Sequence, residues 1–181
     1  MKLIYIIGIP GTGKTTLMRS LMSEIGSNWE EERVIDLLDT EKSGKYRVLG
    51  KYKEGKIYSG TDALSMAVVP KAIEWIETKP DEIIIGEGDR LNNKSFFDAA
   101  GEDLIIIHLT VSDTEREKRY KQRNSNQSEE FIRATKTKVK NILDQFASKM
   151  TVFGPEEGCV HTFLHETQED THKIKNFILN C

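Results

Sequence analysis

The sequence predicts an α/β fold, a three-layer sandwich in which helices cover both faces of a mostly parallel sheet. Short apolar runs alternate along the chain with segments whose apolar residues recur at helical spacing, an order typical of right-handed crossovers between parallel strands. The chain has 181 residues, of which 38% are hydrophobic and 30% charged. It contains neither an internal repeat nor a linker rich in proline and glycine. We therefore expect residues 1–181 to form a single domain.

Apolar runs bounded by glycine or polar residues mark the strands. The run Lys2–Ile7 is rich in isoleucine and ends at a glycine, as expected of a strand buried on both faces. Glu54 and Gly55 form a turn signal between two short runs, which predicts a small hairpin insertion around residues 44–60. The predicted strands are Lys2–Ile7, Arg33–Leu38, Tyr46–Leu49, Lys56–Ser59, Glu82–Ile85, Leu104–Leu109 and Val160–Leu164.

Helical spacing and capping signals mark the helices. Ser112 and Glu115 fit a capping box that opens a helix reaching about Arg123. Pro70 predicts a kink in the helix around it, or a helix that begins there. The predicted helices are Thr15–Ile25, Leu64–Ile76, a short one after the fifth strand, 112–123, Phe131–Met150 and one after Thr167.

Composition restricts the class of protein. No apolar run approaches the roughly 20 residues of a membrane span, so no membrane partner is expected. With two cysteines, Cys159 and Cys181, and no leader-like start, a cytoplasmic protein is predicted. The net charge is −3, which is unlike that of a nucleic-acid coat protein. Residues 114–140 carry nine bases and four acids, a local excess of +5, so phosphate would be bound locally.

Gly8-Ile9-Pro10-Gly11-Thr12-Gly13-Lys14-Thr15 matches the phosphate-loop template G-x-x-x-x-G-K-[ST] at every fixed position. The alternative is a glycine-rich turn that matches by chance, but the motif follows an apolar strand and precedes a helix, as the template requires. Glycines let successive N–H groups face phosphate oxygens, Lys14 reaches the terminal phosphates, and the Thr15 hydroxyl can bind Mg²⁺. The motif does not separate a kinase from an ATPase or a GTPase. The predicted nucleotide-binding residues are Gly8, Pro10, Gly11, Thr12, Gly13, Lys14, Thr15 and Thr16.

A second acidic element, Glu87-Gly88-Asp89-Arg90, follows a buried strand. Ligands collect at the carboxyl ends of strands in an open α/β sheet, where an acid can hold magnesium or act as a base. Glu87 and Asp89 are both candidates for the metal, and the alternative is an ordinary charged turn. Asp39, at the end of the second predicted strand, is a further candidate acid, although either of Asp36 and Asp39 alone is typical of a solvated turn.

The basic segment 114–140 is predicted to form a helical lid. Arg116, Arg119 and Arg123 recur at spacings of three and four, so one helical face carries three guanidinium groups. Arg119 and Arg123 are the predicted catalytic pair, since a closing lid would stabilise charge on the transferring phosphate. Lys136 lies on a face of the next helix. The alternative is a solvated charged face, as most charge runs are.

The phosphate loop, the acidic turn and the arginine-rich segment together resemble P-loop kinases of the nucleoside monophosphate kinase type. The chain also resembles phage-type P-loop kinases that include the 5-hydroxymethyluridine DNA kinases. The segments that carry this second resemblance are the phosphate loop with Thr16, Val48–Tyr52, Gly60–Val68 and the helix Phe131–Asn141.

The resemblance implies ATP with Mg²⁺ and a hydroxyl acceptor near Asp39, Asp62 and Asp89. A basic residue is expected in such proteins between Asp62 and Leu64, and Ala63 departs from that pattern. Asp62, like Thr61, could instead be the N-cap of the following helix. The resemblance also implies the cytoplasm of an infected host cell if the protein is phage-encoded. The predicted acceptor-binding residues are Asp39, Thr61, Asp62, Arg90 and Lys136.

The leading functional hypothesis is an ATP-dependent kinase that phosphorylates the 5-hydroxymethyl group of 5-hydroxymethyluracil in DNA. In it, Lys14, Arg119 and Arg123 neutralise the transferring group, and Asp39 or Asp89 serves the acceptor. A base in a duplex would have to be flipped out to be reached. The second hypothesis is a (deoxy)nucleoside monophosphate kinase, and the third is a nucleotide-hydrolysing switch or motor subunit.

Overall fold

The computed structural model describes residues 1–53, 58–122, 127–147 and 159–181. Its described strands form one seven-stranded sheet in the order β2-β3-β4-β5-β1-β6-β7. β3 is antiparallel to both of its neighbours, and the other described pairs are parallel, which confirms the mostly parallel sheet. The strands are β1 (Lys2–Ile7), β2 (Glu30–Ile35), β3 (Leu38–Ser43), β4 (Tyr46–Leu49), β5 (Ile83–Glu87), β6 (Leu104–Thr110) and β7 (Val160–Leu164).

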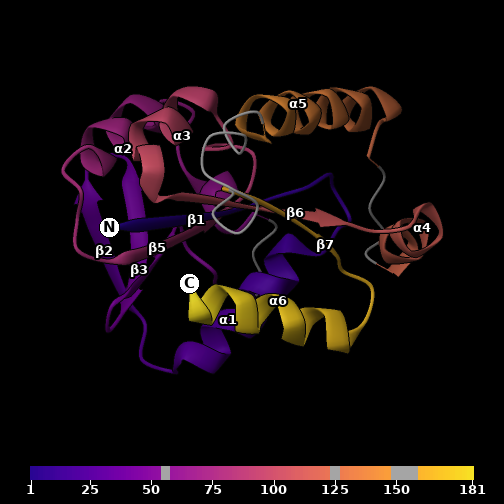
Figure 1. Cartoon of the computed structure of the whole chain (residues 1–181), viewed down its shortest axis with the longest axis horizontal. Coiled ribbons are helices and arrows are strands. Elements are labelled where there is room, and N and C mark those ends of the chain that lie inside the picture. The colour runs from indigo at the N-terminus through magenta and orange to yellow at the C-terminus, as the bar shows by residue number, and fades with distance from the viewer. Residues whose placement is uncertain (54–57, 123–126, 148–158) are drawn as a thin grey trace.

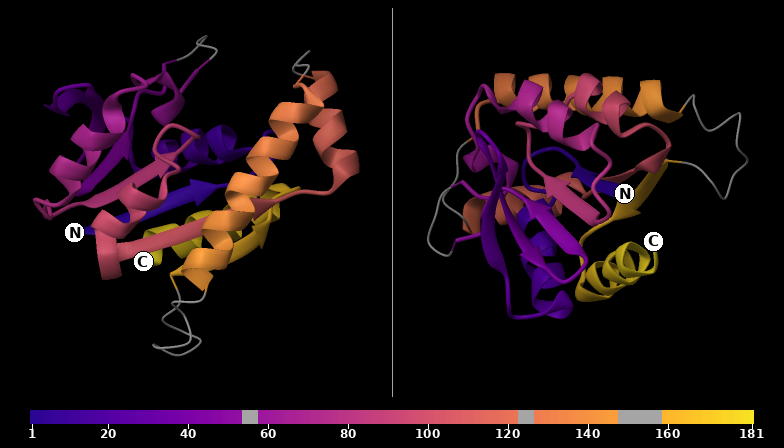
Figure 2. Two further views of the ribbon diagram at one scale, coloured as in Figure 1. Left: turned by 90° about the horizontal axis from the view of Figure 1, so that it is seen from above. Right: turned by 90° about the vertical axis from the view of Figure 1, so that its left-hand side faces the viewer.

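Helices cover both faces of this sheet (Figures 1 and 2), which gives the predicted three layers. α2, α3 and α5 lie over one face, and α1 and α6 lie over the other. The helices are α1 (Lys14–Ile25), α2 (Val68–Ile76), α3 (Lys94–Ala100), α4 (Asp113–Gln122), α5 (Glu129–Ala147) and α6 (Gln168–Asn180), with short 3₁₀ turns at η1 (Thr61–Ala63) and η2 (Gly101–Asp103).

β1 lies between β5 and β6 at the centre of the sheet, and both of its faces are buried. Successive side chains of a strand point to opposite faces, so Leu3 and Tyr5 pack toward α2, α3 and α5, whereas Ile4 and Ile6 pack toward α1 and α6. This two-sided burial explains why the strand is almost continuously apolar. Ile6 of β1 is in register with Glu87 of β5, so both strands end at the same edge of the sheet.

The single strand predicted over Arg33–Leu38 is wrong. The structure places a tight turn at Asp36 and Leu37, and the chain then reverses into β3. Leu37 adopts a φ of 65°, a conformation unusual for a branched apolar residue, so no glycine or asparagine announces the turn in the sequence. Arg33 and Asp39 face each other across the resulting pair of strands, with Nε and Oδ1 2.8 Å apart.

The helix predicted around Pro70 begins at Val68, so the proline lies in the first turn, where its missing N–H costs nothing. The predicted hairpin partner Lys56–Ser59 falls partly on residues 54–57, outside the described residues, and Ser59 is not in a strand. β4 forms its antiparallel hairpin with β3 instead. The helix predicted over 131–150 is α5, whose described part ends at Ala147.

No helix in the described ranges combines the length and the apolar character that crossing a membrane requires.

Candidate active site

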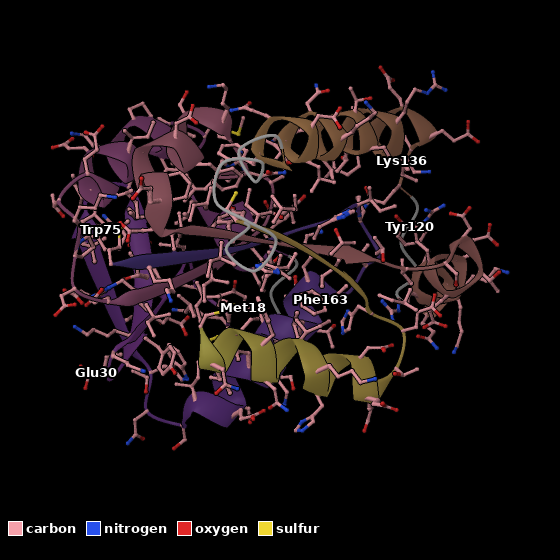
Figure 3. The ribbon with its side chains drawn as sticks, viewed as in Figure 1. Met18, Glu30, Trp75, Tyr120, Lys136 and Phe163 are labelled. Atoms are coloured by element: carbon pink, nitrogen blue, oxygen red, sulfur yellow. The ribbon has the colours of Figure 1, made fainter. Side chains whose placement is uncertain are left out.

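A cavity of about 530 Å³ opens at the edge of the sheet where β1 and β5 end. One wall is the phosphate loop between β1 and α1, and the opposite wall is the acidic turn that follows β5. α4 and α5 approach its mouth, and Figure 3 shows Tyr120 on the first of these helices and Lys136 on the second. The lining residues outside the two walls are Ile7, Tyr58, Asp62, Asn92, Tyr120, Gln127, Phe131 and Thr135.

The phosphate loop turns sharply at Pro10 and Gly11. The Thr12 amide donates to the Ile9 carbonyl at 3.3 Å, and Gly11 has a φ of 87°. Proline followed by a residue of positive φ is the signature of a type II turn. α1 begins directly afterwards at Lys14, so its N-terminal amides and the positive end of its dipole are directed at the cavity wall. Gly8, Pro10, Gly11, Gly13, Lys14 and Thr15, six of the predicted nucleotide-binding residues, all line the cavity.

The Lys14 ammonium donates to the carbonyl oxygens of Gly8 at 2.8 Å and Ile9 at 3.3 Å. It therefore lies against the loop that a triphosphate would occupy. A phosphate would give this ammonium an anionic partner, which is a stronger acceptor than a neutral carbonyl. Thr12 is buried, and its hydroxyl donates to the Ile9 carbonyl, so this side chain stabilises the turn of the loop. Thr16 is exposed on α1 and is not among the lining residues.

Thr15 and Glu87 join the two walls of the cavity. The Thr15 hydroxyl donates to Glu87 Oε1 at 3.1 Å. The Glu87 side chain is 2% exposed, and this burial raises its pKa to about 7, against the opposing effect of the Lys14 charge. Hard oxygen ligands of this kind suit Mg²⁺. In the described part of the chain no group of three histidine, cysteine or acidic side chains could hold a metal ion.

Asp62 supports the acidic turn. Its Oδ1 accepts hydrogen bonds from the backbone amides of Asp89 at 2.6 Å and Arg90 at 3.3 Å. Asp62 and Arg90 both line the cavity. Asp89 is exposed, lines the cavity, and pairs with Lys138 of α5 at 2.8 Å. The two candidate metal ligands thus have different surroundings, because Glu87 faces Thr15 and Asp89 faces α5.

The other predicted acceptor residues lie apart from the cavity. Thr61 is fully buried, and its hydroxyl donates to the Glu87 carbonyl at 2.9 Å and contacts the Tyr5 hydroxyl. Asp39 lies in β3. The hydrogen bond from Arg33 lowers the pKa of its carboxyl, burial opposes this effect, and Lys51 adds to it, so the pKa is lowered overall. Lys136 is exposed on α5 and is not among the lining residues. Asp39 is the second residue of β3 and lies beside the carboxyl end of β4, so it is at the predicted edge of the sheet but is not among the lining residues.

Arg123 lies outside the described residues. Arg119 donates to the Gly11 carbonyl at 3.2 Å, to the His165 carbonyl at 2.8 Å and to Glu115 at 3.0 Å. α4 thus lies against the phosphate loop. Several bases of the segment 114–140 are paired with acids: Arg116, Lys118, Lys138 and Lys140 each form an ion pair with an aspartate or a glutamate.

Several residues that line the cavity were missed by the sequence reasoning. Asn92, Tyr58, Tyr120 and Phe131 line the cavity. Asn92 is buried, and it lies only two residues beyond Arg90, so its proximity to the acidic turn was a usable signal. Tyr58 and Phe131 are 68% and 45% exposed, a high exposure for aromatic side chains. Phe131 was assigned to the apolar face of its helix, because helical periodicity alone does not distinguish a core from a ligand-facing position.

Residues 1–166 match the model of a family described as P-loop Nucleotide Kinase3. The chain belongs to this family. Over 111 residues this P-loop kinase is 27% identical to a shikimate kinase from Thermobifida fusca (strain YX). That match covers 61% of the chain and 60% of the relative, so the chain spans less than two thirds of the relative's length.

A gluconokinase from Sinorhizobium meliloti 1021 is similar in structure, with a TM-score of 0.52. The two chains are 10% identical, and the superposition covers 99% of this chain and 92% of the other. The similarity confirms the α/β kinase fold that was predicted from the order of strands and helices.

Proposed function

We propose that this P-loop kinase transfers the γ-phosphoryl group of ATP to a hydroxyl group of an acceptor bound in the same cavity. The observation that carries this proposal is the joining of two walls: a phosphate loop on one side and a turn bearing Asp89 and Arg90 on the other, bridged by Thr15 and Glu87. Such a cavity can hold donor and acceptor in line, which is the main requirement of phosphoryl transfer.

Each residue has a role in this reaction. Lys14 and the loop amides hold the β- and γ-phosphates. The Thr15 hydroxyl and the Glu87 carboxylate would hold Mg²⁺, which would offset the charge of the phosphates. Asp89 accepts the proton of the acceptor hydroxyl as the new oxygen–phosphorus bond forms, and the bond between the γ-phosphorus and the bridging oxygen breaks to release ADP. Arg123 neutralises the transferring group, as expected of a lid arginine.

For the acceptor we propose 5-hydroxymethyluracil in DNA. The two exposed aromatic side chains at the cavity, Tyr58 and Phe131, are suited to stack on a flat base that has been flipped out of a duplex. Arg133 and Lys136 are exposed on α5, the helix that carries Phe131, and would meet the DNA backbone.

A small anionic hydroxy compound, including a nucleoside monophosphate, is the second candidate. Arg90 lines the cavity and could pair with a carboxylate or a phosphate. Many bases of segment 114–140 are already paired with acids, which leaves less positive charge for a long DNA surface. The relative named as a shikimate kinase favours the same kind of acceptor.

The test is transfer of label from γ-labelled ATP in the presence of Mg²⁺ to three sets of acceptors. These are DNA with and without 5-hydroxymethyluracil, nucleoside monophosphates, and small hydroxy acids such as shikimate and gluconate. Label in the modified DNA alone supports the first proposal, and label in a small acceptor supports the second. Lys14→Ala should abolish transfer and keep the fold, whereas Lys45→Ala, at an exposed lysine of the β3–β4 turn, should change neither. Full activity of Lys14→Ala would contradict the phosphate-loop assignment.

A further inference from the structure

Three consecutive carbonyl oxygens of the phosphate loop each accept a hydrogen bond from a side chain far along the chain. The Tyr120 hydroxyl donates to Pro10 at 2.8 Å, and Arg119 Nη1 donates to Gly11 at 3.2 Å. His165 Nδ1 lies 2.8 Å from the Thr12 oxygen. Two of these donors come from α4, and the third lies just beyond the end of β7.

The remaining loop carbonyls also have donors. Lys14 donates to Gly8 and Ile9, and the Gly13 oxygen accepts from the Leu17 amide as the first bond of α1. Every carbonyl from Gly8 to Gly13 therefore accepts a hydrogen bond from a group of the protein itself. In a planar trans peptide the C=O and the following N–H point in opposite directions. A carbonyl held by a donor thus leaves the following amide directed away from that donor, and an anion site needs amides and no free carbonyl oxygens facing the ligand.

The two glycines between these carbonyls allow the donors to approach. Gly11 and Gly13 both have a φ of 87°. A Cβ on Gly11 would lie 2.8 Å from Arg116 Cγ and 3.0 Å from the Tyr120 ring, and one on Gly13 would lie 2.8 Å from the His165 ring. The loop glycines therefore serve the contact with α4 and His165 as well as the turn itself.

His165 cannot act by touching the nucleotide. It is 4% exposed and does not line the cavity. Because a carbonyl oxygen only accepts, the contact with Thr12 requires the proton on Nδ1. The other nitrogen, Nε2, lies 3.0 Å from the Thr171 hydroxyl of α6. Burial lowers the pKa of His165, and the nearby Arg119 charge lowers it further, whereas the Thr12 contact raises it. The net lowering of the pKa keeps the ring neutral at physiological pH.

We infer that Tyr120, Arg119 and His165 form a carbonyl clamp, a set of positioning residues that holds the phosphate loop in its anion-binding conformation. The inference rests on the proposed role of the loop as the triphosphate site. It gives α4 a second role, since Arg119 supports the loop through Gly11 and His165 and need not contact the transferring phosphate. It also assigns a function to a buried histidine that does not line the cavity.

The experiment measures binding of ATP and of inorganic tripolyphosphate to the full chain by calorimetry. Tyr120→Phe removes one hydroxyl and retains the ring, and His165→Leu removes the donor to Thr12. Each should weaken the binding of both ligands by roughly threefold to tenfold, the effect of one lost hydrogen bond. His165→Asn places an amide donor where Nδ1 stood and should recover most of the affinity. Tyr46→Phe and His172→Leu, at a half-buried tyrosine of β4 and an exposed histidine of α6, are matched controls and should bind as the wild type does.

A second readout follows the imidazole itself. With ¹⁵N-labelled histidine, NMR should show His165 as the neutral tautomer protonated on Nδ1, and the Tyr120→Phe variant should retain that signal. Unchanged affinity in both Tyr120→Phe and His165→Leu, or a proton on Nε2 alone, would overturn the clamp while leaving the site intact. A wild-type chain that binds neither ATP nor tripolyphosphate would overturn the site and the clamp together. If His165→Leu does not fold, Tyr120→Phe and a comparison of His165→Asn with His165→Gln decide the question. The asparagine variant should bind more tightly than the glutamine variant, and equal affinity of the two would count against the clamp.

Discussion

Thr15 and Glu87 are 72 positions apart in the sequence, yet the hydroxyl of the first donates to the carboxylate of the second at 3.1 Å. The contact follows from the topology. β1 and β5 are parallel neighbours, so the loop after β1 and the last residue of β5 meet at one edge of the sheet. It brings two hard oxygen ligands together and buries an acid beside a phosphate loop.

Glu87→Gln should raise the stability of the ligand-free protein above neutral pH. Burial raises the pKa of Glu87 from 4.5 to about 7, so the folded protein holds this proton more tightly than the unfolded chain. Its contribution to the free energy of unfolding is therefore full below about pH 4.5 and is lost as the pH rises through about 7. The loss amounts to about 3 kcal/mol, which glutamine avoids because it stays neutral.

The measurement is urea unfolding of both proteins at about pH 5 and about pH 8, without Mg²⁺ and nucleotide. The two free energies of unfolding should be similar at the lower pH and differ at the higher one. A variant less stable than the wild type at about pH 8 would show that the buried carboxylate is charged without penalty. The same variant should transfer phosphate poorly, because it loses the carboxylate proposed to hold Mg²⁺.

Glu82→Gln should have the opposite effect on stability. Glu82 forms ion pairs with Arg47 and Lys42, and these partners lower its pKa to about 2. Its stabilisation is present above about pH 4.5 and is lost as the pH falls toward about 2. Arg47 is buried and stays charged, so the loss of its partner should lower the free energy of unfolding by about 3 kcal/mol at neutral pH.

Urea unfolding at neutral pH and at about pH 3 tests this, since the difference between variant and wild type should shrink in acid. Glu77→Gln is the control, because this acid is exposed at the end of α2 and its substitution should have little effect. A Glu82→Gln protein as stable as the wild type would mean that Arg47 is satisfied by Glu32 and Thr40 alone.

The sequence predicted the parts of the fold and site that depend on local pattern. These parts are the strand Lys2–Ile7, the phosphate loop that ends at Lys14 and the acid that ends β5. Each lies in a short segment whose pattern of residues fits a single local structure. The reversal of the chain into β3 was not predicted, because the turn at Leu37 has no glycine to mark it. Such a turn is decided by the pairing of β2 with β3, which is a tertiary effect.

The contacts of α4 could not be predicted from the local sequence pattern, for another reason. Arg119 was recognised by its charge and its helical spacing, but its partners Gly11 and His165 offer backbone carbonyls, which every residue carries. No residue type announces such a contact. His165 was likewise uninformative as a lone histidine, and only the fold brings it to Thr12.

Phe131→Ala and Tyr58→Ala test which acceptor the cavity takes. Both side chains line the cavity and are exposed, and stacking on a base is worth about 1–3 kcal/mol for each aromatic ring. If the acceptor is a base in DNA, each substitution should raise the KM for DNA by roughly tenfold and leave the KM for ATP unchanged. Met66→Ala is the control, since Met66 is 78% exposed and lies outside the cavity lining.

Steady-state kinetics at two salt concentrations complete the test, because DNA binding weakens steeply with salt and binding of a small acceptor does so weakly. An unchanged KM in both aromatic variants, with little dependence on salt, would exclude base stacking and leave Arg90 and a small anionic acceptor as the explanation of the site.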